Sequence, residues 1–126
     1  MPESQRAVVW VVDDVESVRK SIAAVLETAN LSVRDYPSAD AFLGEYQPGM
    51  RGCLVVDYNM PGMTGLELLQ KLKADRAAPP AIVITGHGSK ALQERLLEAG
   101  ALAMLDKPVD ADELIALIER ALADSS

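Results

Sequence analysis

The sequence predicts an α/β fold in which five parallel strands form a doubly wound sheet with helices on both faces. Two observations support this prediction. Short, uninterrupted apolar runs alternate with segments whose apolar residues recur at helical spacing, through about five successive units. Turn-forming residues separate many of these segments, as at Pro61-Gly62 and Gly86-His87-Gly88. Strict alternation of strands and helices is typical of parallel β-α-β units.

The expected strands are short apolar runs, of the kind that is buried on both faces of a sheet. They cover residues 7–12, 31–36, 53–56, 81–84 and 101–105. The second run is less apolar than the others, which places it toward an edge of the sheet. No internal repeat, low-complexity segment or linker interrupts the pattern. We therefore expect one domain across residues 1–126, with residues 1–6 as a polar N-terminal tail.

Helical segments are expected after the strands. The first carries one apolar stripe, formed by Val18, Ile22, Val25, Leu26 and Ala29. Thr64 and Glu67 have the spacing of a capping box, in which each side chain satisfies a free backbone donor at the start of a helix. Asp110 and Glu113 repeat this spacing before the last helix. Helix starts are therefore predicted close to residues 65 and 111.

Composition argues against several classes of protein. The 126-residue chain is 49% hydrophobic and 25% charged, as expected for a soluble globular domain. Its net charge of -7 argues against a nucleic-acid-binding surface. No stretch approaches ~18 consecutive apolar residues and no signal-peptide pattern is present, so no membrane association is expected. The single cysteine, Cys53, cannot form an internal disulfide, which fits a cytoplasmic location.

Polar residues of interest come where the predicted strands end. Asp13 and Asp14 follow the first strand, Asp57 the third, Thr85 the fourth and Lys107 the fifth. In the strand order 2-1-3-4-5, the first and third strands are neighbours at the topological switch point, where ligands gather. This order would bring three carboxylates together. Because like charges repel, a hard divalent cation with oxygen ligands is expected between them, and Mg²⁺ is the natural candidate.

In these positions the chain resembles the receiver domains of bacterial two-component response regulators, over roughly residues 7–122. The motifs that carry the resemblance are Asp13-Asp14, Asp57 with Met60-Pro61-Gly62, Thr85 after an apolar strand, and Lys107-Pro108 after the fifth. Each motif alone is weak, but together and in order they are specific. The stretches 57–68 and 84–88 are similar to those of the FixJ-like branch. The resemblance implies a flavodoxin-like receiver fold.

The resemblance also implies a chemical role for each motif. Asp57 would take a phosphoryl group from a phosphohistidine on a sensor histidine kinase or a histidine phosphotransfer protein, forming an acyl phosphate. The implied ligands of Mg²⁺, or of Mn²⁺, are Asp13, Asp14, Asp57 and the backbone carbonyl of Asn59. Lys107 would supply a second positive centre, with its bond to Pro108 in the cis form. The chain would then be a signalling domain rather than an enzyme.

A switch follows from the same resemblance. Thr85 would donate its hydroxyl to the phosphoryl group and relay the change to the face made by the fourth helix, fifth strand and fifth helix. In the family an aromatic residue of the fifth strand takes the vacated space, whereas this chain has Met104, so we expect an incomplete shift. Asn59 and His87 are expected to modulate the lifetime of the phosphoryl group. The resemblance also allows homodimer formation through this face on phosphorylation.

Three other functions fit part of the pattern. A flavodoxin-like FMN-binding domain shares the fold class, but the acidic loop of residues 13–16 would repel its phosphate. A phosphatase with an aspartate nucleophile requires a second acid two residues after the nucleophile, where this chain has Asn59. A receiver-like module that binds partners without phosphorylation is disfavoured by the complete set of acids. Taken singly, Asp13 and Asp14 also suit the start of a helix, where the dipole favours acids.

Overall fold

The computed structural model describes residues 7–76 and 78–124 of the chain, so the predicted tail at residues 1–6 lies outside the described residues. Within them, five parallel strands form one sheet in the order β2-β1-β3-β4-β5, which confirms the predicted fold class and strand order. The strands are β1 (Val8–Val12), β2 (Ser32–Tyr36), β3 (Gly52–Asp57), β4 (Ala81–Thr85) and β5 (Ala101–Asp106). The helices are α1 (Glu16–Thr28), α2 (Ala39–Glu45), α3 (Gly65–Ala74), α4 (Lys90–Glu98) and α5 (Ala111–Asp124).

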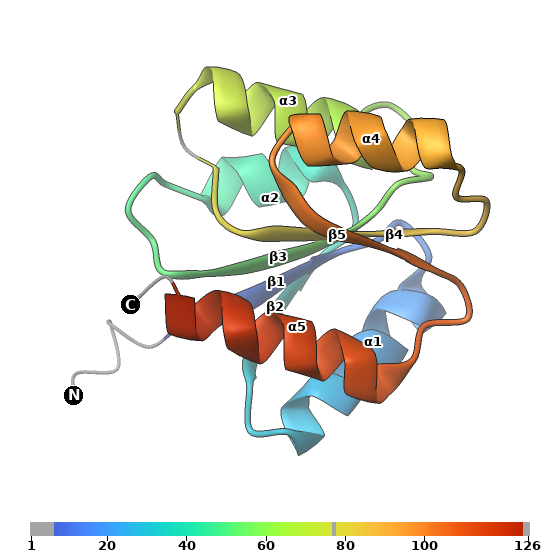
Figure 1. Ribbon diagram of the computed structural model, residues 1–126. Coiled ribbons are helices and arrows are strands. Elements are labelled where there is room, and N and C mark those ends of the chain that lie inside the picture. Colours follow the sequence, from blue (N-terminus) through green and yellow to red (C-terminus); the bar gives the residue numbers. More distant parts are fainter. Residues whose placement is uncertain (1–6, 77, 125–126) are drawn as a thin grey trace.

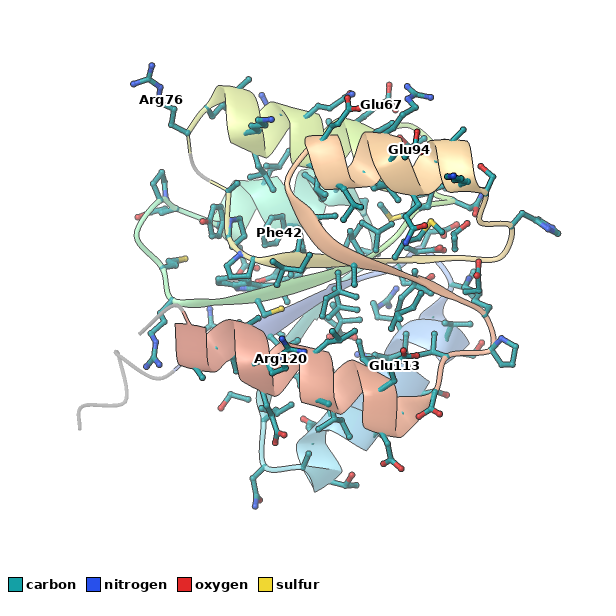
Figure 2. All side chains as sticks on the ribbon, viewed as in Figure 1. Phe42, Glu67, Arg76, Glu94, Glu113 and Arg120 are labelled. Carbon is teal, nitrogen blue, oxygen red and sulfur yellow. The ribbon has the colours of Figure 1, made fainter. Side chains whose placement is uncertain are left out.

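The sheet separates two apolar layers. Helices α1 and α5 cover one face, and α2, α3 and α4 cover the other (Figure 1). Successive side chains of a strand point to opposite faces, so a central strand needs apolar residues at every position. In β1, Val9 packs in the layer of Leu26 on α1, whereas Trp10 packs in the layer of Phe42 on α2. Figure 2 shows Phe42 between the sheet and its helices.

The predicted helix starts are confirmed by their hydrogen bonds. Thr64 Oγ1 accepts the N–H of Glu67 at 3.1 Å, and Glu67 Oε1 accepts the N–H of Thr64 at 2.9 Å, which completes the capping box of α3. Asp110 Oδ1 accepts the N–H of Glu113 at 3.0 Å at the start of α5. These caps fix where the loops after β3 and β5 end. In the described part of the chain, no helix is long and apolar enough to cross a membrane.

The apolar stripe predicted for α1 is wrong at Val25, which is 36% exposed. Leu26 is buried as predicted, and the other buried residues of α1 are Arg19 and Ala23, which precede it by seven and three residues. Val25 precedes Leu26 by one residue and therefore lies about 100° away around the helix axis. The buried side thus includes a charged residue that the apolar pattern could not indicate, and Arg19 proves to be connected to the polar end of the sheet.

We predict that Cys53 does not react with thiol reagents in the folded protein. Its side chain is completely buried in β3, and burial raises the pKa of its thiol to about 12. The thiolate, which is the reactive form, is therefore both scarce and inaccessible. Titration with Ellman's reagent at pH 8 should detect no thiol in the native protein and one per chain in guanidinium chloride. Rapid labelling under native conditions would contradict the buried position of β3.

Candidate functional site

The carboxyl ends of four strands meet at one edge of the sheet. Strand β1 pairs with β3 so that Val12 lies opposite Val56. Asp13 and Asp57 are the next residues, and the pairing therefore places them side by side. Thr85 is the last residue of β4, and its carbonyl accepts the backbone N–H of Lys107 at 2.9 Å. The structure thus gathers the predicted polar residues at the switch point between β1 and β3.

Three carboxylates form a cluster at this edge. Asp13, Asp14 and Asp57 each offer one oxygen, and these oxygens lie within 4.8 Å of one another. Asp13 is 2% exposed and Asp57 is 4% exposed, whereas Asp14 is exposed to solvent. The cluster therefore has two buried acids and one acid at its rim. The expectation that the strand order would bring these carboxylates together is confirmed.

Short turns hold the two buried acids. Asp13 Oδ1 accepts the backbone N–H of Val15 at 2.9 Å, and Asp57 Oδ1 accepts the backbone N–H of Asn59 at 3.3 Å. Each aspartate thus bonds to the N–H two residues ahead, as in an Asx turn. The second carboxylate oxygen of each is left out of the turn. Gly65, the first residue of α3, packs closely against the end of β3. A Cβ at this position would lie 3.1 Å from the carbonyl oxygen of Asp57, so a larger residue would crowd the loop.

The electrostatics of the cluster suit a divalent cation. Burial raises the pKa of Asp57, although the nearby Lys107 acts in the opposite direction. Burial also raises the pKa of Asp13, and the charge of Asp57 adds to the effect, against the hydrogen bond from Val15. A positive charge next to these buried acids would favour their ionised forms. Mg²⁺ and Mn²⁺ prefer oxygen ligands, and the residues present fit such an ion.

Lys107 supplies the cationic side chain of the site. Its Nζ lies 3.5 Å from Asp57 Oδ2, and its side chain is 36% exposed against 4% for Asp57. The bond between Lys107 and Pro108 is cis, as the family resemblance implied. The ammonium therefore faces the buried carboxylate while keeping contact with solvent. A negatively charged group that approached Asp57 would meet this cation at the rim.

Thr85 bonds to both residues that were expected to act as modulators. Its side chain is buried, with 1% exposed, and its hydroxyl donates to Asn59 Oδ1 at 3.5 Å. The same hydroxyl oxygen accepts the backbone N–H of His87 at 3.2 Å. The loops after β3 and β4 are thus joined through one hydroxyl. Movement of Thr85 toward Asp57 would break its hydrogen bond to Asn59.

The structure adds two residues to the switch region that sequence reasoning missed. Gly88, in the loop after β4, donates its N–H to Asp106 Oδ1 at 3.1 Å. A Cβ on Gly88 would lie 2.6 Å from Met104 Cε and would also clash with the Asp106 carboxylate. This loop therefore lies against β5, next to Met104. The repeated glycines of Gly86-His87-Gly88 indicated a flexible loop, but no sequence signal revealed the close contact with β5.

Arg19 was also missed, although it is the one buried cation among the described residues. From α1, its guanidinium donates to the carbonyl oxygen of Asp13 at 2.8 Å and to Asp35 Oδ2 at 3.1 Å. Asp35 lies on β2 and also pairs with Lys20 at 2.9 Å. The contact with Lys20, followed by that with Arg19, lowers the pKa of Asp35. Arg19 therefore joins the acidic loop to α1 and β2.

Comparison with known proteins agrees with this geometry. The family model for the response regulator receiver domain matches residues 9–119. The chain belongs to this family. The match includes the four strand ends that form the site, so the receiver resemblance stated from the motifs is confirmed. Receiver domains are signalling modules of two-component systems. This chain is therefore the receiver domain of a two-component response regulator.

Individual relatives agree on the branch. The chain is 44% identical over 126 residues to the transcriptional regulatory protein FixJ of Azorhizobium caulinodans, covering all of this chain and 59% of that protein. A crystal structure of FixJ-N has a TM-score of 0.85 and 42% identity, covering 94% of this receiver and 95% of that chain. The structure of the response regulator StyR has a TM-score of 0.89 and 38% identity, and the match covers 95% of this receiver and 61% of that chain. The receiver thus spans little more than half the length of the FixJ relative.

We predict that replacing Arg19 by Met lowers the free energy of unfolding by about 2 kcal/mol. The substitution removes a charge-assisted hydrogen bond and leaves the buried carbonyl of Asp13 without its donor. Replacing Lys20 by Met is the matched control, because Lys20 is an exposed partner of the same Asp35 and should cost less than about 1 kcal/mol. Urea denaturation followed by circular dichroism measures both. Equal losses would show that the contact with Asp13 contributes nothing.

Proposed function

We propose that this receiver is a phosphorylation-dependent switch whose phosphoacceptor is Asp57. The observation that carries the proposal is the position of this carboxylate. It is buried at the end of β3, lies in a cluster with Asp13 and Asp14, and has the ammonium of Lys107 at 3.5 Å. Phosphoryl transfer depends chiefly on positioning and on neutralising the charge of the phosphoryl oxygens. The site therefore provides a positioned nucleophile, Asp57, and a nearby cation, Lys107.

The chemistry of the transfer follows from these residues. One oxygen of the ionised Asp57 carboxylate attacks phosphorus in line with the bond to the leaving group, that bond breaks, and an acyl phosphate forms. Lys107 remains next to the modified side chain and pairs with a phosphoryl oxygen. Asp13, Asp14, Asp57 and the backbone carbonyl of Asn59 would hold Mg²⁺ or Mn²⁺. When bound, such an ion neutralises negative charge on the phosphoryl oxygens.

Thr85 carries the change away from the site. The phosphoryl group offers new acceptor oxygens, so the Thr85 hydroxyl exchanges its bond to Asn59 for one to the modified Asp57. The loop after β4 moves with it, and Met104 on β5 fills part of the space behind it. Asn59 and His87, which flank this path, modulate how long the acyl phosphate persists.

The output surface of this switch is the face made by α4, β5 and α5. It carries two of the large apolar side chains that are exposed on the described part of the chain, Leu97 at 48% and Leu102 at 51%. Their exposure supports a partner at this face, and we assign it to homodimer formation on phosphorylation. The phosphodonor is a sensor histidine kinase or a histidine phosphotransfer protein. The net charge of -7 supports a role without direct nucleic-acid binding by this chain. We further propose that the chain forms one receiver domain and acts in the cytoplasm.

The other functions considered from the sequence gain no support from the site. A phosphate-binding FMN domain would require its phosphate next to three clustered carboxylates. A phosphatase of the aspartate-nucleophile class would require an acid at position 59, where the Asn59 side chain instead accepts a hydrogen bond from Thr85. A receiver-like module that binds partners without phosphorylation would not require the ammonium of Lys107 to face Asp57. The phosphoacceptor function therefore uses more of the observed geometry than any of these.

We predict that Asp57 gains one phosphoryl group from acetyl phosphate in the presence of Mg²⁺. Intact-mass spectrometry should show a single addition to the parent protein and none to Asp57→Asn, which keeps the size of the side chain but loses the nucleophile. Asp75→Asn is the matched control, since Asp75 caps the distant end of α3. An unmodified parent protein, or undiminished modification of Asp57→Asn, would reject the proposal.

We predict that phosphorylation shifts the α4-β5-α5 face only incompletely, because Met104 is a flexible side chain in place of an aromatic one. Amide chemical shifts recorded with and without beryllofluoride, a phosphoryl mimic, should place the bound form between the unmodified state and the fully switched state. Met104→Tyr restores the family pattern and should move the same amides further along the same line. A complete shift in the parent protein would contradict this role of Met104.

A further inference from the structure

The loop after β1 carries two of the three clustered acids, and a side chain from outside the loop holds its first residue. The backbone N–H of Asp13 donates to the carbonyl of Tyr36 at 3.1 Å, which continues the pairing of β1 with β2. The carbonyl oxygen of Asp13 accepts the guanidinium of Arg19 at 2.8 Å. Arg19 therefore fixes a backbone group at the point where the chain leaves the sheet and enters the acidic loop.

The guanidinium of Arg19 is itself held in one orientation. Its Nε donates to Asp35 Oδ2 at 3.1 Å, while its Nη1 donates to the Asp13 carbonyl. A guanidinium is planar and rigid, so two bonds from different nitrogens fix its plane. Arg19 is 9% exposed, and Asp35 is also bonded by Lys20 at 2.9 Å. The position of the Asp13 carbonyl is thus set from β2 through a buried side chain.

The carbonyl of Asp13 belongs to the peptide group that joins Asp13 to Asp14. Because a peptide group is planar, a bond that holds its oxygen limits rotation of the whole group, including the Cα atoms of both residues. The two carboxylates project from these Cα atoms, and together with Asp57 they offer oxygens within 4.8 Å of one another. The orientation of one peptide group therefore controls how two of the three acids are presented.

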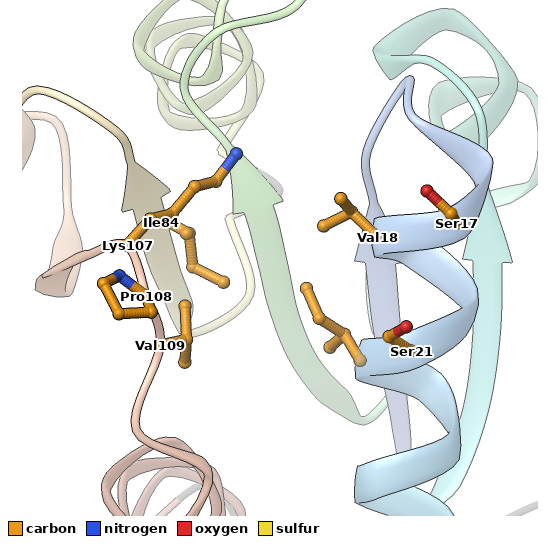
Figure 3. A pocket seen from close by; sticks show the side chains of 8 residues that line it. Ser17, Val18, Ser21, Ile84, Lys107, Pro108 and Val109 are labelled. Atoms are coloured by element: carbon orange, nitrogen blue, oxygen red, sulfur yellow. The ribbon is translucent and has the colours of Figure 1, made fainter.

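Arg19 lies on the side of α1 that faces β2. The other side of this helix presents Ser17, Val18 and Ser21 to a cavity of about 330 Å³, which Lys107 also lines (Figure 3). Arg19 comes two residues after Ser17, about 200° around the helix axis, and does not line this cavity. A substitution of Arg19 therefore changes the support of the acidic loop without changing the residues around Lys107.

We propose that Arg19 is a positioning residue for cation binding at the acidic cluster. It holds the peptide group between Asp13 and Asp14 in the orientation that brings both carboxylates together with Asp57. The inference rests on the proposed function, in which this cluster holds Mg²⁺ or Mn²⁺, and adds a residue that supports the ligands. A purely electrostatic role of Arg19 would have the opposite consequence. A positive charge near carboxylates opposes cation binding, so its removal would strengthen binding.

The test measures the dissociation constant of Mg²⁺ by titration, followed through the amide chemical shifts of the loops after β1 and β3. In Arg19→Met we expect this constant to rise about tenfold, the lower end of the loss caused by removing a group that orients metal ligands. Lys20→Met is the matched control, because Lys20 pairs with the same Asp35 from an exposed position. It removes an equal charge, and its dissociation constant should equal that of the parent protein or fall slightly.

Two further variants separate positioning from lost stability and from lost charge. Leu26→Ala removes buried apolar contacts from the same helix, about two turns beyond Arg19, and destabilises the fold. Its dissociation constant for Mg²⁺ should match that of the parent protein. Arg19→Lys keeps the positive charge but replaces the rigid fork by a single ammonium, so it should bind Mg²⁺ more weakly than the parent protein.

Phosphorylation by acetyl phosphate separates this inference from the function on which it rests. At saturating Mg²⁺ the initial rate for Arg19→Met should return close to that of the parent protein, because Asp57 and Lys107 are unchanged. If Arg19→Met binds Mg²⁺ as tightly as the parent protein or more tightly, and the parent is phosphorylated, the positioning role alone is overturned. A parent protein that binds Mg²⁺ but takes no phosphoryl group would reject the proposed function instead. A parent protein that does not bind Mg²⁺ would overturn the positioning role together with the cation site.

Discussion

The pairing of β1 with β3 is the constraint on which the rest of this molecule depends. It places Asp13 beside Asp57, although 43 residues separate them in the chain, and so concentrates negative charge at one edge of the sheet. The hydrophobic packing of both layers against the central strands stabilises this arrangement, and the buried carboxylates follow from it. A site with such excess charge is suited to bind cations and to receive a phosphoryl group with them.

The acidic loop is supported from the side of the sheet as well. Arg19 donates to the main chain of Asp13 and pairs with Asp35, so that α1, β2 and the loop after β1 meet in one buried hydrogen-bonded group. Because the guanidinium bonds to a carbonyl, it fixes the backbone and leaves the Asp13 carboxylate free of that contact. The acids thus remain available for a ligand while the chain that carries them is held in place.

The opposite side of the site is held less firmly. Thr85 is tied to Asn59 by a long hydrogen bond of 3.5 Å, and the loop after β4 is tied to β5 by the bond from Gly88 to Asp106 near the surface. A phosphoryl group can compete with such contacts, whereas it could not displace the buried strands. This difference in strength between the two sides supports the proposed switch through Thr85 and Met104.

Most of the fold was determined by local sequence. The order of the elements was predicted by the apolar residues of the central strands and by the capping box at Thr64 and Glu67. The polar residues at the strand ends predicted that Asp13, Asp14 and Asp57 lie together. Only the tertiary structure decided that Arg19 is buried, that Val25 is exposed, and that Gly88 lies against Met104. Periodicity reports which side of a helix is apolar, but it does not reveal which polar side chain finds buried partners. Those partners, such as the Asp13 carbonyl and Asp35, come from segments that become neighbours only when the sheet forms.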